Sequence, residues 1–171
     1  TVTEFGTGVF TSCNSLHTIY IDENNPTFFM YNRVMYKRNP LSLFFVPRAI
    51  SGSIELYNGI TTIPSSAFQY RNVTEVIIPE SVIEIKDAAF NSCSYLTSVT
   101  IGDNVTSIGR DAFSNCSSLQ EIEIPFSVKI IDQLAFSSCN NLTEVTLNNG
   151  LETIGSYAFY YCSLLSSITL P

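Results

Sequence analysis

Five cysteines are the side chains of this sequence with the most chemical potential, because a thiolate can bind a metal ion or attack a substrate. No pair of them has a CxxC or CxxH spacing, so the sequence does not indicate a zinc site. Each lies three residues after a phenylalanine, and this regular placement predicts a column of buried, reduced thiols that fill small apolar spaces. Neighbouring thiols could also couple as disulfides where their geometry is suitable. The five are Cys13, Cys93, Cys116, Cys139 and Cys162.

Acid–base and nucleophilic catalysis have little support in this sequence. His17 is the only histidine, and no serine lies in a sequence context that would pair it with a histidine. We therefore expect a protein that is not an enzyme and that uses neither a cofactor nor a catalytic metal.

The cysteines recur because the chain is built from a repeated unit. Residues 96–118, 119–141 and 142–164 are three consecutive units with no gap between them. A period of about 23 residues with LxxLxL in each unit is the signature of a leucine-rich repeat, and it predicts a solenoid whose coils stack on one another. An Ala-Phe pair marks the units at Ala67-Phe68, Ala89-Phe90, Ala112-Phe113, Ala135-Phe136 and Ala158-Phe159.

Each unit is expected to form two arms. In the first arm, such as residues 96–101, apolar and polar side chains alternate, which predicts a strand with one buried face; successive strands must run parallel. In the second arm, Ile108 and Ala112 are four residues apart and Phe113 and Cys116 are three apart, which predicts a short helical turn. The expected fold is a leucine-rich-repeat solenoid of the α/β repeat class, mostly β with short helical turns, and a parallel sheet on one face. Its first-arm strands are predicted at residues 16–21, 51–56, 73–78, 96–101, 119–124, 142–147 and 165–170.

The repeat is interrupted by residues 22–50. Two apolar runs, Val34–Tyr36 and Leu41–Val46, predict an inserted β-hairpin. We expect residues 1–171 to form one domain around this insertion, and no apolar run is long enough to predict a membrane span. The chain begins without methionine and ends directly after a predicted strand, so we expect it to be a fragment of a longer protein.

The outward positions of the first-arm strands are the best candidates for a binding site, because the repeated core leaves only these positions free to vary. Five of them are glutamates and none is lysine or arginine. We hypothesise that Glu121, Glu123 and Glu144 form an acidic patch for a basic segment of a protein partner, or for a divalent cation. The alternative is a solvated face that keeps the protein soluble. The candidate face comprises Tyr20, Glu55, Glu75, Ile77, Ser98, Thr100, Glu121, Glu123, Glu144 and Thr146.

The inserted segment is a second candidate contact because it holds four of the eight basic residues. It could meet an anionic partner or the acidic face of another molecule, or it could simply pack its aromatic side chains on the first coils. The net charge of −7 argues against nucleic acid as a partner. The four basic residues are Arg33, Lys37, Arg38 and Arg48.

Four N-x-[ST] sequons could carry glycan if the protein is secreted by a eukaryote. They begin at Asn72, Asn104, Asn115 and Asn141.

Repeats of the form L-x-x-[IV]-x-[IL]-P-x-x-V-x-x-I-G-x-x-A-F-x-x-C-x-x resemble the BspA-like, or Treponema-type, leucine-rich repeats of bacterial and protist surface proteins. The resemblance covers nearly the whole chain. The interruption also resembles one carried by this family, here Asp22–Pro26, Val34–Lys37 and Leu43–Pro47. It implies a cell-surface or secreted adhesion module that binds a host or microbial surface or matrix protein, with no shared catalytic residues. An intracellular scaffold of the same repeats and a structural spacer of a surface protein remain alternatives.

Overall fold

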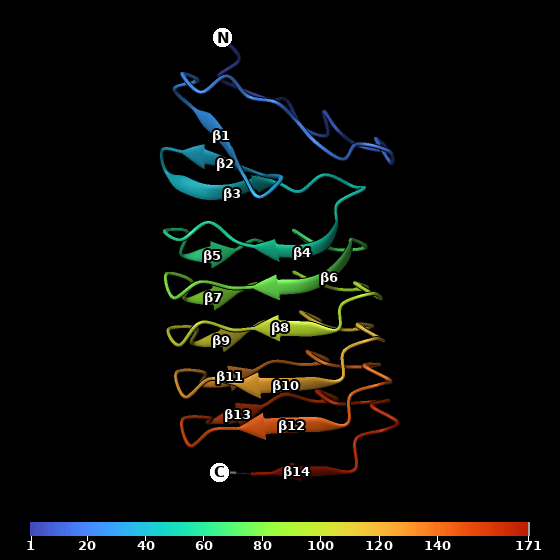
Figure 1. The fold of residues 1–171 in the computed structure, drawn as a ribbon. Coiled ribbons are helices and arrows are strands. Elements are labelled where there is room, and N and C mark those ends of the chain that lie inside the picture. Colours follow the sequence, from blue (N-terminus) through green and yellow to red (C-terminus); the bar gives the residue numbers. More distant parts are fainter. Residues whose placement is uncertain (171) are drawn as a thin grey trace.

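The computed structural model describes residues 1–170. Its main body is a stack of coils, and each coil places a first-arm strand and a shorter second-arm strand beside those of the next coil (Figure 1). The first-arm strands are β4 (Ser51–Glu55), β6 (Asn72–Ile77), β8 (Ser98–Thr100), β10 (Glu121–Ile124), β12 (Glu144–Leu147) and β14 (Ser167–Thr169).

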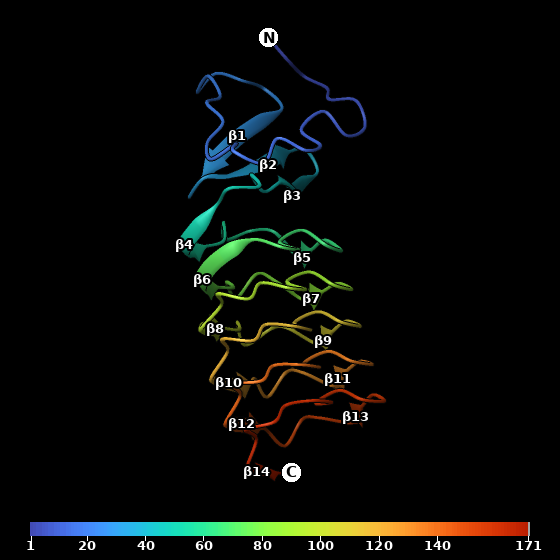
Figure 2. The same cartoon turned by 90° about the vertical axis from the view of Figure 1, so that its right-hand side faces the viewer.

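The two arms form separate parallel sheets. Figure 2 shows the first-arm strands along one side of the stack and the second-arm strands along the other. The first-arm strands pair in the orders β4-β6-β8 and β10-β12-β14, and the second-arm strands form one five-stranded sheet, β13-β11-β9-β7-β5. The second-arm strands are β5 (Thr62–Ile63), β7 (Glu84–Ile85), β9 (Ser107–Ile108), β11 (Ile130–Ile131) and β13 (Thr153–Ile154).

Six of the seven predicted first-arm strands are present, but the prediction of a strand at residues 16–21 was wrong. A parallel strand needs a neighbouring coil to accept its ladder of hydrogen bonds. Here the inserted strands lie between the first residues and β4 (Figure 1). Instead, Leu16 makes two backbone hydrogen bonds: its carbonyl oxygen accepts from Ala49 N at 3.0 Å, and its own N donates to Cys13 O at 3.1 Å.

The predicted helical turns are also wrong, because residues 1–170 contain no helix. The residue before each Ala-Phe pair and the residue two positions after it have positive φ, between 55° and 61°, which breaks a right-handed helix. Some backbone amides still bond three residues back, as from Ala67 N to Pro64 O at 3.2 Å, which explains the helix-like spacing. Alternate amides bond to the next coil, as from Phe68 N to Ala89 O at 2.7 Å. The second arm is therefore another ladder between coils.

A file of phenylalanines runs through the centre of the stack. The rings are nearly parallel, with centroid separations of 5.0, 5.1, 5.3 and 5.4 Å between successive coils. Burying each such ring stabilises the fold by about 1.5–3 kcal/mol. The prediction that the repeated side chains align in files is confirmed for Phe68, Phe90, Phe113, Phe136 and Phe159.

The cysteines form a second file, with one exception. The thiol of Cys93 donates a hydrogen bond to Phe68 O at 3.0 Å, and Cys116, Cys139 and Cys162 donate in the same way to the phenylalanine carbonyl of the preceding coil. Cys13 is exposed and lies outside the file, contrary to prediction. The insertion separates its segment from the regular coils, so no neighbouring coil buries it.

The insertion contains three antiparallel strands in the order β1-β2-β3, one more than a hairpin. They are β1 (Phe28–Tyr31), β2 (Val34–Arg38) and β3 (Leu41–Phe45). The buried side chain of Tyr36 accepts a hydrogen bond from Tyr57 N at 3.1 Å, which ties the insertion to the coil that begins with β4. The insertion thus shares one core with the repeats.

Candidate functional site

The outward side chains of β10 and β12 stand directly beside one another. The parallel register pairs Glu121 with Glu144 and Glu123 with Thr146, and all four are exposed, while Ile122 between them is buried. Adjacent strands of a sheet lie about 4.8 Å apart, so the first pair brings two carboxylates close together. The sequence alternation thus places this part of the predicted face on a real sheet surface.

The same register continues onto the strands towards the insertion. Glu75 of β6 pairs with Ser98 of β8, and Ile77 pairs with Thr100. Glu55 is exposed at the end of β4. Tyr20 does not belong to this face, because its segment forms no strand; the residue is 93% exposed near the first residues of the chain.

A groove of about 510 Å³ crosses the sheet where β8 and β10 meet. Six predicted residues line it, and the turns that follow the strands contribute Glu80, Asp103 and Pro125. Sequence reasoning missed these turn residues, although Glu80 and Asp103 occupy the same place in consecutive units. The predicted residues in the groove are Ser98, Thr100, Glu121, Glu123, Glu144 and Thr146.

The two acidic turns are held in place by hydrogen bonds between coils. A carboxylate oxygen of Glu80 accepts a hydrogen bond from Asp103 N at 2.7 Å, and Asn104 Nδ2 donates to Glu80 O at 2.8 Å. The groove therefore has a wall whose backbone is fixed.

The groove is acidic without compensation. Its lining includes five carboxylates and, among residues 1–170, no lysine, arginine or histidine. The ion pairs of the described residues lie elsewhere, joining Lys86 to Glu84 and Arg110 to Asp87 and Asp111. Like charges opposed across neighbouring strands destabilise a sheet. A bound cationic group would relieve this repulsion.

Possible metal ligands and the one histidine are dispersed over the described residues. Over the described range 1–170, no three His, Cys, Asp or Glu side chains gather closely enough to hold a metal. His17 Nδ1 donates a hydrogen bond to Ser15 O at 2.7 Å, and its side chain is exposed.

The basic residues of the insertion have separate surroundings. Arg33 donates hydrogen bonds to Ser51 O at 2.8 Å and Ser53 O at 3.0 Å, and so covers the free edge of β4. Arg38 donates to the carbonyl oxygen of Asn25 at 3.1 Å and lies over the ring of Phe29 at 4.9 Å. Lys37 is half-buried on β2, whereas Arg48 is exposed after β3.

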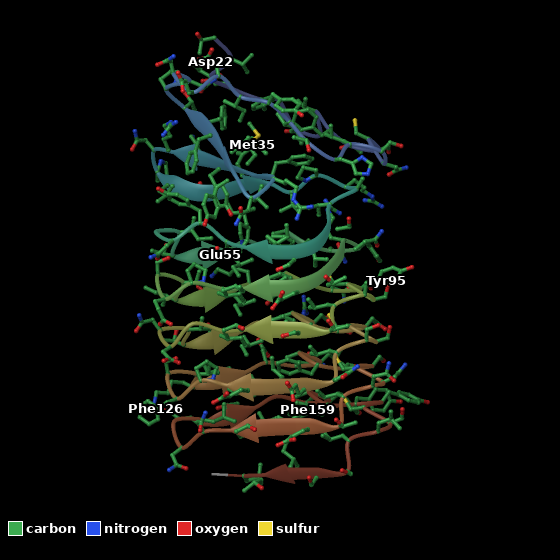
Figure 3. All side chains as sticks on the ribbon, viewed as in Figure 1. Asp22, Met35, Glu55, Tyr95, Phe126 and Phe159 are labelled. Carbon is green, nitrogen blue, oxygen red and sulfur yellow. The ribbon has the colours of Figure 1, made fainter. Side chains whose placement is uncertain are left out.

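Exposed aromatic side chains and all four sequon asparagines lie on the surface of the stack. Figure 3 shows Tyr95 and Phe126 projecting from opposite edges, whereas Phe159 lies within the width of the stack. Asn104 uses its amide in the contact with Glu80, and Asn115 Nδ2 donates to Ser114 Oγ at 3.1 Å. The exposed sequon asparagines are Asn72, Asn104, Asn115 and Asn141.

None of the described residues belongs to a helix long and apolar enough to cross a membrane.

Comparisons with known proteins agree with this architecture. Residues 61–171 match the model of the BspA type leucine rich repeat region, in six copies. No curated protein sequence matches the chain.

Several solved structures share the fold. A leucine-rich cell surface protein of Faecalibacterium prausnitzii is 26% identical, with a TM-score of 0.80 over 96% of this chain and 44% of that protein. A leucine-rich repeat protein of Eubacterium ventriosum is 24% identical, with a TM-score of 0.70 over 96% of this chain and 51% of that protein.

A leucine-rich repeat protein of Bacteroides capillosus is 27% identical, with a TM-score of 0.58 over 74% of this chain and 99% of that protein. The chain thus spans about half, or less, of the first two of these proteins. From the repeat match and the stacked coils together, this chain belongs to the BspA-type leucine-rich repeat family.

Proposed function

We propose that the chain is a non-enzymatic recognition module of a surface or secreted protein, and that its acidic groove binds a basic, extended segment of a host or microbial protein. The observation that carries the proposal is the in-register opposition of Glu121 and Glu144 inside a groove that holds no positive side chain. A surface location is supported by the family and by the cell surface protein of F. prausnitzii.

The groove fits an extended segment for a geometric reason. The groove carboxylates come from two neighbouring strands and from the turns of two coils, so they are spread along the stack rather than gathered around one point. A peptide with lysine or arginine side chains at intervals could meet them in turn. Complementary charge of this kind mainly raises the association rate and selects the partner.

The proposal is tested with a labelled peptide of alternating lysine and threonine as the probe. Fluorescence anisotropy would measure its affinity for the parent chain and for the triple variant Glu121→Gln, Glu123→Gln, Glu144→Gln. We expect the variant to bind about 3- to 100-fold more weakly, because each of the three charged contacts contributes on the order of 0.2–1 kcal/mol. The affinity of the parent should also fall as salt is added.

A matched control removes the same charge from another part of the surface. The exposed residues Glu4, Glu23 and Glu152 lie outside the groove, and their replacement by glutamine changes the net charge equally. This control should bind like the parent. Equal weakening in both triple variants would mean that net charge alone attracts the probe, and the groove would lose its assigned role.

The compartment and the spacer alternative need a second experiment. The parent and the two triple variants would be used to capture proteins from extracellular matrix and from cytosol. A partner that is retained from matrix by the parent and lost by the groove variant supports a surface recognition module. Identical capture by all three would favour an intracellular scaffold or a spacer whose recognition lies outside this face.

A further inference from the structure

The structure has a second pocket, whose lining differs from that of the acidic groove because it contains aromatic and basic residues and no acidic one. It encloses about 360 Å³ between the first residues of the chain and the insertion. Its walls are aromatic: the ring centroids of Phe5 and Phe10 are 5.6 Å apart, those of Phe5 and Phe44 are 5.6 Å apart, and those of Phe10 and Phe45 are 4.8 Å apart. Pockets of this size, with aromatic side chains beside polar groups, commonly take small organic groups.

Two arginines, Arg48 and Arg71, line the same pocket. No acidic side chain is among the lining residues, and no ion pair within residues 1–170 involves either guanidinium. Arg48 is exposed, and Arg71 is half-buried. Two positive groups thus share one cavity without a negative partner in the described chain.

Arg71 is held in position by its own contacts. Its Nη1 donates to Gln69 O at 2.7 Å, and its Nε and Nη2 donate to Val46 O at 3.3 and 3.1 Å. Five N–H donors are available on a guanidinium, so two remain after these three contacts. Burial, and after it the charge of Arg48, lower the pKa of Arg71. Both causes disfavour the cation, and a bound anion would offset them.

The rim of the pocket supplies further donors. Thr11 and Ser12, which carry hydroxyl groups, are among the lining residues, together with Gly6 and Gly8. A carboxylate bound between the arginines could therefore accept hydrogen bonds from more than one side, and charge-assisted bonds of this type are the stronger class.

We propose that this pocket binds a carboxylate carried on an aromatic or similarly bulky apolar group, such as the last residue of a peptide. The guanidinium of Arg48 pairs with the carboxylate, the fixed guanidinium of Arg71 adds a second donor pair, and the phenylalanine rings receive the apolar body. This site is independent of the acidic groove, and its charge is opposite.

The test is isothermal titration of the chain with N-acetyl-L-phenylalanine, with N-acetyl-L-phenylalanine amide and with inorganic phosphate. The first probe has both the charge and the ring, the amide lacks the charge and phosphate lacks the ring. We expect the acid to bind saturably, with the other two about tenfold or more weaker. No binding of the acid, or equal binding of the acid and either other probe, would overturn the proposal.

Variants assign the binding to the pocket. Arg48→Gln is expected to weaken binding of the acid about tenfold, since it removes one charged partner. Arg110→Gln removes the same charge from an exposed position in another coil and should leave binding unchanged. Unchanged affinity in Arg48→Gln, with a thermal melt that matches the parent, would contradict the site. Binding of the lysine-threonine peptide in these variants reports the acidic groove separately.

Discussion

Arg71 donates two hydrogen bonds to the carbonyl oxygen of Val46, 25 residues earlier in the chain, at 3.3 and 3.1 Å. Cys93 makes the equivalent contact one coil later, from its thiol to Phe68 O, also 25 residues earlier. Arg71 thus occupies the repeat position that is cysteine in the other coils. Its longer side chain makes the equivalent hydrogen bond to a backbone carbonyl oxygen 25 residues earlier. It joins the repeats to the insertion.

Arg71→Met should therefore destabilise this junction. The change leaves the carbonyl of Val46 without the donor that the structure assigns to it, and a buried acceptor without a partner costs about 1–3 kcal/mol. Urea unfolding followed by circular dichroism would measure the free energy of unfolding. Arg110→Met, at an exposed position, is the control and should change it by less than about 0.5 kcal/mol.

The stacked rings make a graded prediction along the file. Phe113 is fully buried with a ring on each side, whereas Phe159 is half-buried and stacks on Phe136 alone among the described residues. Phe113→Ala should cost about 3–5 kcal/mol, as for a large core deletion. Phe159→Ala should cost clearly less. Equal costs in denaturant titrations would contradict a file in which neighbouring coils supply the stability.

Features that recur with the repeat period could be predicted from the sequence. Features that depend on contacts between neighbouring coils could not. Alternation of apolar residues located six of the seven predicted first-arm strands, because each of these six has a neighbouring coil on which to bury its apolar face. The second arm was misread because Leu134 and Tyr157 adopt positive φ without being glycine or asparagine. Their conformation is imposed by hydrogen bonds to neighbouring coils, such as Leu134 N to Ser156 O at 3.0 Å, and no local signal encodes these.

The candidate face divides along the same line. Glu121, Glu123 and Glu144 follow from strand alternation, whereas Glu80 reaches the groove through the path of its turn. Tyr20 was assigned to the sheet because its segment repeats the pattern of a strand. The alternating pattern was not sufficient at residues 16–21, because the insertion lies between this segment and the coil with which it would have paired.

Thiol reactivity should follow the positions of the cysteines. Cys13 is exposed and should react first with a disulfide reagent such as DTNB. Cys162 should follow, because it is half-buried and a hydrogen bond with the Cys139 thiol lowers its pKa. The buried thiols of Cys93, Cys116 and Cys139 should react only on unfolding. Rapid reaction of more than two thiols in the native protein would contradict the buried file.

The buried thiols also predict a loss of stability at alkaline pH. Burial raises the pKa of Cys93 from 9.0 to about 12, so the folded state holds a proton that the unfolded chain releases. The protonated Cys93 thiol therefore makes its full contribution to the free energy of unfolding below about pH 9, and this contribution is lost as the pH rises towards 12. The slope is about 1.4 kcal/mol per pH unit for each such thiol. Burial also raises the pKa of Tyr36, which adds to the loss at higher pH.

The variant Cys93→Ala isolates this effect. It removes one titrating thiol and should make the decline between pH 9 and 11 shallower, even though its stability at pH 7 is lower than that of the parent. Chemical denaturation at several pH values gives the slope directly. A slope that is the same in the variant and the parent would mean that Cys93 does not titrate differently in the two states.

The variant Glu144→Lys separates the effect of the acidic face on stability from its effect on peptide binding. In the parent, Glu121 and Glu144 oppose each other across neighbouring strands, and like charges there are destabilising. A lysine at 144 would turn this repulsion into an attractive cross-strand pair and should raise the free energy of unfolding by about 0.2–1 kcal/mol. The same change puts a positive charge into the groove, so binding of the lysine-threonine peptide should weaken. Because the two effects have opposite signs, lost binding cannot be attributed to lost folding. If the variant were less stable than the parent and bound the peptide equally well, both ideas would be contradicted: that Glu121 and Glu144 repel each other, and that the groove carboxylates bind the peptide.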